Sequence, residues 1–238
     1  MKKAIVIGAS SGIGRELSRI LSEEGFIVGL VSRRLILLSE LEDSLAGKIF
    51  VKKIDITNPE VSMTALTELI KEMGQVELVV ISSGVGNINE QLDWELENET
   101  IATNVVGFSA MANVAIRHFI QQGSGHLVGI SSVAALRGGK EAPAYNASKA
   151  YLSNYLEGLR QKVTGLGDSI IITEIRAGFV DTAMAKGDGL FWVSSVEKAA
   201  RQIYSAIVTK KSCVYVTRRW RLVGWLLNML PGSIYKRL

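Results

Sequence analysis

The chain has 238 residues, of which 47% are hydrophobic and 21% charged, and its formal net charge is +4. This length and composition suit one α/β domain with enough residues to bury a full core. No apolar run approaches the ~20 residues that span a bilayer, and no signal peptide follows Lys2 and Lys3. The single cysteine, Cys213, excludes an internal disulfide and a cysteine-rich metal site, and it is compatible with a reducing cytoplasm. We expect a cytoplasmic protein with no bound metal and no nucleic-acid partner.

The charge is unevenly distributed along the chain. Residues 198–238 carry nine basic side chains and no acidic one, whereas residues 1–197 carry 18 basic and 23 acidic side chains, a net charge of −5. An acidic body with a basic C-terminal end suggests that this end meets something anionic. The alternative is a basic end that is simply solvated.

The first predicted strand, Ala4–Ile7, leads into a glycine-rich loop. Gly8, Gly12 and Gly14 are spaced Gly-x-x-x-Gly-x-Gly and precede the helical pattern of residues 15–21. Small residues let a backbone approach a pyrophosphate, and a helix N-terminus offers N–H donors and the positive end of its dipole. We therefore predict a dinucleotide site here, rather than a purely structural turn. Its residues are Gly8, Ser10, Ser11, Gly12, Ile13 and Gly14.

The second predicted strand, residues 26–31, ends at Ser32-Arg33-Arg34. A cofactor without a 2′-phosphate favours a carboxylate near this point, hydrogen-bonded to the ribose. Two guanidinium groups instead suit the geometry of a phosphate. The sequence therefore favours NADP(H) over NAD(H), although either arginine alone is also compatible with a solvated loop charge.

The middle of the chain alternates predicted helices and strands, as expected for a parallel sheet. The helices cover residues 36–45, 59–73, 92–99, 101–121, 145–165 and 196–209, and the strands cover residues 49–54, 77–81, 127–130, 169–175 and 213–216. Asn104 falls inside the long helix 101–121, next to Val105 and Val106. Asparagine is a middling helix former, so its place among apolar neighbours indicates a role other than helix formation.

Tyr145 and Lys149 lie four residues apart in a predicted helix, so their side chains share one face, one turn apart. An ammonium group beside a phenol favours the phenolate, and together with a cofactor's positive charge it is expected to lower the pKa of the tyrosine toward the range useful for general acid–base catalysis. Ser132 lies thirteen residues before Tyr145, at the end of a predicted strand. The Tyr-x-x-x-Lys spacing alone is weak evidence for a catalytic site. Together with Ser132 and the glycine-rich loop it is strong evidence.

With these motifs the chain resembles the short-chain dehydrogenase/reductase family, from Lys2 to about Thr217. The resemblance implies an α/β fold, a Rossmann-type doubly wound parallel sheet in the order 3-2-1-4-5-6-7 with helices on both faces. It implies a single catalytic domain over residues 1–217, followed by a tail over 218–238, and a homodimer or homotetramer. It also implies a catalytic set made of Asn104, Ser132, Tyr145 and Lys149, in which Asn104 holds a water that links Lys149 to solvent. The implied cofactor contacts beyond the glycine-rich loop are Ser32, Arg33, Arg34, Asp55, Ile56, Ser83, Gly84, Tyr145, Lys149, Gly178, Val180 and Thr182.

The sequence departs from the family pattern at two neighbouring strand ends. Ile7 stands where threonine is usual, and Ile81-Ser82-Ser83-Gly84 replaces the usual Asn-Asn-Ala-Gly. We expect an apolar contact between Ile7 and Ile81 in place of a polar pair, a kind of exchange that can be nearly neutral. Ala177-Gly178 also replaces the usual Pro-Gly, which loosens the turn slightly.

These residues predict an NADPH-dependent oxidoreductase that reduces a small-molecule carbonyl, or oxidises the alcohol in reverse. The resemblance implies that Ser132 holds the carbonyl oxygen, Tyr145 gives it a proton, and Lys149 lowers the pKa of Tyr145 and holds the nicotinamide ribose. The alternative is an NADPH-binding sensor or scaffold without turnover. Such a protein is expected to lose one of the four catalytic positions, and none is lost here.

Residues 183–195 form a short candidate lid over the substrate. Gly187 and Gly189 suggest mobility. Phe191 and Trp192 either cover an apolar substrate or pack on the body of the protein.

The C-terminal tail carries an apolar stripe at helical spacing, made of Leu222, Trp225, Leu226, Met229 and Leu230. Trp220 and Trp225 are residues favoured at a lipid–water boundary, and Arg218, Arg219, Arg221, Lys236 and Arg237 flank the stripe. The ending resembles that of short-chain reductases that act on polyprenyl-linked sugars. We therefore expect either peripheral contact with the inner face of a membrane, with an apolar or lipid-linked substrate, or packing on the body or a neighbouring subunit.

Overall fold

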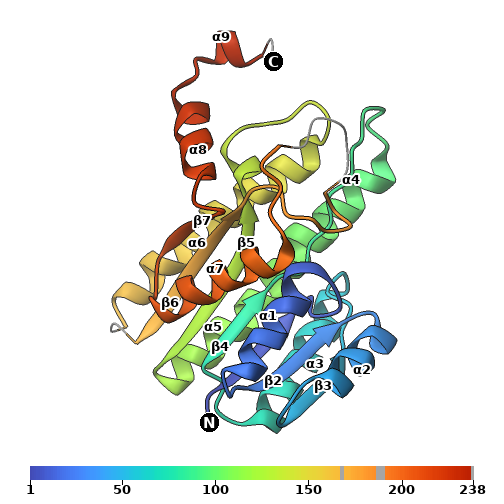
Figure 1. Ribbon diagram of the computed structural model, residues 1–238, viewed down its shortest axis with the longest axis vertical. Helices are drawn as coiled ribbons and strands as arrows, with labels where there is room; N and C mark the ends of the chain where they lie inside the picture. Colours follow the sequence, from blue (N-terminus) through green and yellow to red (C-terminus); the bar gives the residue numbers. More distant parts are fainter. Residues whose placement is uncertain (167–168, 186–190, 237–238) are drawn as a thin grey trace.

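The computed structural model describes residues 1–166, 169–185 and 191–236. One parallel sheet of seven strands, ordered β3-β2-β1-β4-β5-β6-β7, forms the centre of the molecule (Figure 1). The predicted α/β fold class and its 3-2-1-4-5-6-7 strand order are therefore confirmed. The lid glycines Gly187 and Gly189 lie outside the described residues.

Helices and strands alternate along the chain. The strands are β1 (Lys3–Ile7), β2 (Ile27–Ser32), β3 (Ile49–Lys53), β4 (Leu78–Ile81), β5 (Gly125–Ser132), β6 (Ile170–Ala177) and β7 (Cys213–Val216). The helices are α1 (Gly12–Glu23), α2 (Leu35–Ser44), α3 (Pro59–Met73), α4 (Trp94–Ile101), α5 (Phe108–Gln122), α6 (Pro143–Thr164), α7 (Val196–Val208), α8 (Trp220–Met229) and α9 (Gly232–Tyr235). A π-helical segment, Ala102–Gly107, joins α4 to α5, and a short 3₁₀ helix, Val133–Leu136, follows β5.

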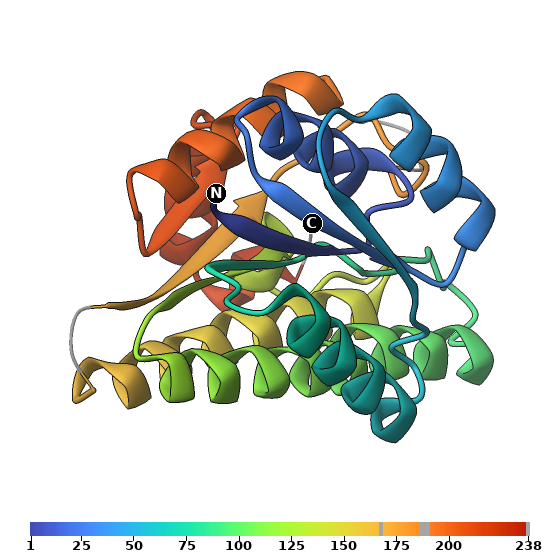
Figure 2. The same ribbon diagram turned by 90° about the horizontal axis from the view of Figure 1, so that it is seen from below.

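Helices cover both faces of the sheet, so the central strands are apolar on both sides, as buried parallel strands require. Helices α1, α2 and α7 lie on one face, and α3, α5 and α6 lie on the other (Figure 2). Each face holds its own cluster of buried side chains: Leu17, Leu38 and Ile203 belong to the first, and Leu66 and Phe119 to the second. The two layers hold the sheet rigid, so the loops at its carboxyl edge have fixed starting points.

The two isoleucines at the departures from the family pattern meet as expected. Ile7 and Ile81 are register partners of the neighbouring strands β1 and β4, and both are fully buried in the same cluster. The carbonyl oxygen of Ile7 accepts hydrogen bonds from the backbone N–H groups of Ser82 and Ser83, at 2.8 and 2.9 Å. The backbone therefore ties the two strand ends together where a polar side-chain pair is missing.

The long helix predicted over residues 101–121 is not regular. Its first part is the π-helical segment Ala102–Gly107, in which Asn104 is fully buried, and the regular helix α5 begins only at Phe108. π-helical turns commonly occur at functional sites because they reposition side chains and free backbone groups. The prediction of a single α-helix over residues 101–121 is therefore wrong.

The tail after β7 forms two helices that stand out beyond the carboxyl ends of the strands (Figure 1). Gly224 of α8 lets the helix approach β7 closely, because a Cβ there would lie 2.9 Å from the hydroxyl of Tyr215. The hydroxyl of Tyr235 in α9 donates a hydrogen bond to the carbonyl of Gly138. Among the described residues no helix is long and apolar enough to cross a membrane.

Candidate active site

A cavity of about 790 Å³ opens where the loops after the carboxyl ends of the strands converge. Most of the predicted site residues line it: Gly8, Ser10, Ser11, Gly12, Ile13, Ser32, Arg33, Arg34, Asp55, Ile56, Ser83, Gly84, Ser132, Tyr145, Lys149, Gly178, Val180 and Thr182. Two predicted residues, Gly14 and Asn104, lie behind this lining. Within the described part of the chain no three His, Cys, Asp or Glu side chains are placed to hold a metal ion.

The glycine-rich loop leaves no room for side chains. Gly8 and Gly12 have φ angles of +96° and +53°, a region that favours glycine. A Cβ at Gly8 would lie 2.6 Å from the backbone nitrogen of Ser83, and one at Gly14 would lie 2.2 Å from the carbonyl oxygen of Gly8. A Cβ at Gly12 would lie 3.1 Å from the methyl group of Thr182. At these glycines the loop before α1 therefore exposes backbone without side chains, and Thr182 lies beside it.

Arg34 is fixed to this loop by its guanidinium group. Its Nε and Nη2 atoms donate to the hydroxyl of Ser10 at 3.1 and 2.7 Å, and Nη2 also donates to the hydroxyl of Ser11 at 2.7 Å. The hydroxyl of Ser32 accepts from the backbone N–H of Arg34 at 3.0 Å. The first loop and the end of β2 therefore form one polar wall of the cavity.

Asp55 continues this wall after β3. Burial raises the pKa of its carboxyl, but hydrogen bonds from the backbone and hydroxyl of Thr57, with the charges of Arg33 and Lys53, bring the pKa net below its usual value. Arg33 is exposed and lines the cavity beside Arg34. Two guanidinium groups and an ionised carboxylate therefore meet at this end of the cavity.

Ser132, Tyr145 and Lys149 come together at the other side of the glycine-rich loop. Ser132 ends β5, and Tyr145 and Lys149 lie one turn apart near the start of α6. The Nζ atom of Lys149 lies 5.7 Å from the centroid of the Tyr145 ring and donates to the carbonyl of Ile130 at 3.0 Å. A Cβ at Gly86 would lie 2.9 Å from the Tyr145 ring, so the loop after β4 packs directly against that ring.

Burial controls the proton affinities of both groups. It lowers the pKa of Lys149, which is 4% exposed, to about 8. It raises the pKa of Tyr145, and a hydrogen bond with Ser132 opposes that rise only in part. In the protein without cofactor, desolvation of the phenol is therefore the largest effect on the Tyr145 pKa, and the predicted lowering by Lys149 together with the cofactor's positive charge stays a prediction. At neutral pH Tyr145 therefore keeps its proton.

The low pKa of Lys149 gives a prediction that needs no assumption about function. The folded-state pKa of about 8 lies below the ordinary value of 10.5, so between these values the unfolded state binds more protons. Stability therefore rises with pH across this window, by about 3 kcal/mol from this group. We expect urea titrations of the wild type to show this rise relative to Lys149→Met, which lacks the amine. Parallel pH curves for the two proteins contradict it.

Asn104 joins the loop after β4 to helix α6 from behind the cavity. Its Oδ1 atom accepts from the backbone N–H of Val85 at 2.9 Å, and its Nδ2 atom donates to the carbonyl of Val85 at 2.8 Å and to the hydroxyl of Ser148 at 2.9 Å. A Cβ at Gly84 would lie 3.3 Å from Asn104 Oδ1 and 3.4 Å from Lys149 Nζ. The π-helical segment thus places Asn104 where it fixes the loop after β4 against the helix that carries Lys149.

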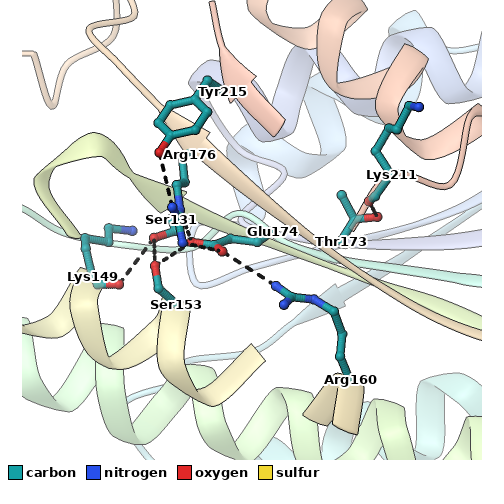
Figure 3. A network of polar contacts seen from close by, with 9 residues as sticks. All are labelled: Ser131, Lys149, Ser153, Arg160, Thr173, Glu174, Arg176, Lys211 and Tyr215. Atoms are coloured by element: carbon teal, nitrogen blue, oxygen red, sulfur yellow. Dashed lines mark hydrogen bonds and ion pairs between the residues drawn. The ribbon is translucent and has the colours of Figure 1, made fainter. Parts of the chain in front are cut away.

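A buried network holds that helix against the sheet (Figure 3). The hydroxyl of Ser131 donates to the carbonyl of Lys149 at 3.3 Å and pairs with the hydroxyl of Ser153, which donates to Glu174. Arg176 donates to Glu174 at 2.9 and 3.2 Å. The second arginine near this carboxylate is Arg160, at 3.6 Å. A buried charge that lost such partners would be costly, so the network fixes α6 on β5 and β6.

Sequence reasoning missed part of the lining, which comes from the tail. Trp220, Val223 and Leu227 of α8 and Tyr235 of α9 all line the cavity. The indole of Trp220 is 2% exposed and lies so close to Gly178 that a Cβ there would be 2.1 Å from Nε1. The sequence held a signal for these residues. Trp220, Val223 and Leu227 recur at helical spacing, on the face opposite the apolar stripe that begins at Leu222.

Phe191 and Trp192 pack on the base of α8. The ring centroid of Trp220 lies 5.0 Å from that of Phe191 and 6.1 Å from that of Trp192. The guanidinium of Arg219 lies over the Trp192 ring and donates to the Trp192 carbonyl at 3.0 Å. Neither aromatic residue lines the cavity, and both keep exposed surface, 49% for Phe191 and 42% for Trp192.

The strand order and the glycine-rich loop together define a Rossmann-type dinucleotide-binding fold. A family model described as short chain dehydrogenase matches residues 2–189. An uncharacterized oxidoreductase of Myxococcus xanthus is 37% identical over 188 residues, which cover 77% of this chain and 74% of that protein. The chain belongs to the short chain dehydrogenase family and is an oxidoreductase of that family.

Solved structures of low sequence identity share the fold. A short chain dehydrogenase/reductase from Burkholderia phymatum in complex with NAD has a TM-score of 0.85 and 19% identity, covering 94% of this chain and 92% of that one. A short-chain dehydrogenase from Sphingobium yanoikuyae in complex with NADPH has a TM-score of 0.82 and 20% identity, covering 98% of both chains. Nicotinamide cofactors with and without the 2′-phosphate thus occur among proteins of this fold.

Proposed function

We propose that the protein is an NADPH-dependent reductase of a small-molecule carbonyl compound, or the corresponding alcohol dehydrogenase in reverse. One observation carries the proposal: Ser132, Tyr145 and Lys149 line the same cavity as the glycine-rich loop and the pair Arg33 and Arg34. A hydroxyl, a protonated phenol and a buried amine beside a dinucleotide cradle are the groups needed to move a proton to a carbonyl oxygen.

The described residues fit NADPH. Gly8 and Gly14 have no room for a side chain, which suits the close approach of a pyrophosphate to the backbone. Arg33 and Arg34 suit a 2′-phosphate, which they would bind as a charge-assisted pair. At the adenine end we assign contacts to Asp55 and Ile56. The remaining assigned contacts are Ser10, Ser11, Gly12, Ile13, Ser32, Ser83, Gly84, Gly178, Val180 and Thr182.

Each catalytic residue has a separate task in the proposed reduction. NADPH, when bound, supplies the hydride. The Ser132 hydroxyl holds the carbonyl oxygen by a hydrogen bond, and Tyr145 donates the proton that this oxygen needs as it becomes an alcohol. Lys149 holds the ribose hydroxyls of the cofactor, and its charge stabilises the phenolate that Tyr145 leaves behind. Asn104 anchors a water through which Lys149 exchanges protons with solvent.

The cavity lining also contains a set of apolar side chains, which we assign to the substrate: Ile88, Val133, Met184, Val223 and Leu227. Apolar walls with a few placed polar groups favour a substrate that is itself largely apolar and carries one carbonyl group.

The proposal is tested by screening carbonyl compounds with the purified full chain and following NADPH oxidation. Aldehydes and ketones of increasing alkyl length should be included, each with NADPH and with NADH. We expect turnover of at least one class of compound, faster with NADPH. NADPH binding without turnover of any compound in either direction would instead favour a sensor or scaffold.

We further propose a cytoplasmic enzyme that assembles as a homodimer or homotetramer, with residues 1–217 as the catalytic domain. Light scattering on the purified protein measures the assembly directly.

A further inference from the structure

The outer face of α8 is an apolar surface that no described part of the chain covers. This outer face consists of Leu222, Trp225, Leu226 and Met229, which are 68%, 64%, 54% and 60% exposed. They recur at helical spacing, so they form one stripe. Large side chains exposed together mark an interaction site rather than an ordinary surface.

The opposite face of the same helix is occupied. Trp220 is buried, and Val223 and Leu227 line the cavity. The following helix is fixed as well, because Tyr235 donates to the carbonyl of Gly138 and lies under the guanidinium of Arg137. The helix cannot turn its outer face inward without removing a wall of the cavity. Because no described residue covers this face, we look for its cover in a partner.

The charge around the outer face of α8 indicates what kind of partner would cover it. Arg218, Arg219, Arg221 and Lys236 are exposed on this segment, and no acidic residue occurs after Glu197. Trp225, unlike Trp220, is placed for the lipid–water boundary that its amphipathic ring favours. Trp220 does not have the boundary position predicted from the sequence, because it lies in the cavity wall. An apolar stripe flanked by cations alone fits an anionic lipid surface.

A second copy of this chain is a poorer cover. A two-fold contact would bring the same surface of both copies together. Because every charge on this segment is positive, the cations of one copy would then face the cations of the other. Like charges brought together oppose association, whereas an anionic bilayer neutralises them.

We propose that residues 218–236 dock on an anionic phospholipid bilayer, with the outer face of α8 among the acyl chains. The segment is too short to span, so it lies in the interface. Because the inner face of α8 is a wall of the cavity, docking places that wall next to the bilayer. Resting on the proposed function, this assigns the substrate to carbonyl compounds dissolved in the membrane, such as long-chain aldehydes or ketones.

The test is co-flotation of the full chain with vesicles of phosphatidylcholine alone or mixed with phosphatidylglycerol. We expect wild type to float with the mixed vesicles. The triple variant Leu222→Gln/Trp225→Gln/Leu226→Gln should lose at least about tenfold in partitioning, because three apolar side chains no longer enter the interface. The matched control is Val61→Gln on α3, which is also exposed and should float like wild type. NADPH binding and turnover of a short water-soluble carbonyl should stay unchanged in the triple variant, which shows that it is folded.

The charges are tested separately. Arg218→Gln/Arg221→Gln should lower partitioning onto mixed vesicles by about fivefold per charge, and added salt should act in the same direction. Lys71→Gln/Arg117→Gln, which removes two exposed charges elsewhere, should have no such effect.

Three outcomes overturn the proposal. If wild type floats with neither kind of vesicle while it still reduces carbonyls, docking is wrong and the proposed function stands. If the triple variant instead lowers the molecular mass measured by light scattering, a second copy covers the outer face. If short polar carbonyls are reduced with higher kcat/KM than long-chain ones, the substrate assignment is wrong even where flotation succeeds.

Discussion

Tyr145→Phe is expected to lower kcat by ~10²–10⁴ while NADPH affinity changes little, because only the proton donor is lost. The ring stays, so the contact with Gly86 and the packing at the start of α6 are kept. Burial keeps the pKa of Tyr145 above its ordinary value, so at neutral pH this residue carries the proton that the carbonyl oxygen needs. Steady-state kinetics with the best compound of the screen measures kcat, and fluorescence titration measures NADPH binding.

Tyr151→Phe is the matched control for this substitution. Tyr151 lies on the same helix, is 39% exposed, and pairs with the hydroxyl of Ser109 at 2.9 Å. It does not line the cavity, so its loss should leave kcat unchanged. If Tyr145→Phe keeps activity within about tenfold of wild type, Tyr145 is not the general acid. If it loses NADPH binding as well, the fall in kcat reports a damaged site and not a missing proton.

The sheet and the grouping of Ser132, Tyr145 and Lys149 around one cavity were predictable because their signals are local. Apolar runs that end in glycine or serine predict buried parallel strands, and the carboxyl ends of such strands meet at one edge. Ser132 therefore had to lie near the glycine-rich loop. The four-residue spacing placed Tyr145 and Lys149 on one helix face without any knowledge of tertiary contacts.

The π-helical segment was not predictable because its cause is non-local. Asn104 bonds to Val85, nineteen residues away, and to Ser148, 44 residues away. A single sequence shows the helical period of this region. It does not show the distant hydrogen-bond partners that accompany the change from α-helical to π-helical geometry. The same holds for the pKa of Tyr145, whose rise depends on how deeply the folded chain buries the phenol.

The C-terminal tail shows a third limit of prediction from sequence. Helical spacing identified an apolar stripe but gave no way to tell whether that stripe or the opposite face touches the body. In the structure the smaller face, around Trp220 and Gly224, packs inward because Gly224 lets α8 approach Tyr215. The face with more apolar side chains is left outside, which is the reverse of the usual arrangement for a helix on a globular domain.

A preference for NADPH over NADH is the other large effect that we expect, and it depends on Arg33 and Arg34. Both arginines line the cavity, and the 2′-phosphate proposed as their partner is absent from NADH. A hydrogen bond to a charged group contributes about 1.5–3 kcal/mol, so the loss of one arginine should weaken NADPH binding by about 10- to 150-fold. Calorimetric titration with NADP⁺ and NAD⁺ measures both affinities for each protein.

The two arginines need separate variants because only one of them also supports the loop. Arg34 donates to Ser10 and Ser11, so Arg34→Ala disturbs the pyrophosphate cradle and should weaken the binding of both cofactors. In Arg33→Ala this support remains, so NADP⁺ affinity should fall while NAD⁺ affinity stays within about threefold of wild type. Lys53→Ala is the matched control, because Lys53 also lies near Asp55 but does not line the cavity. Equal affinities of wild type for both cofactors, or an equal fall for both in Arg33→Ala, would show that the 2′-phosphate is not bound at this wall.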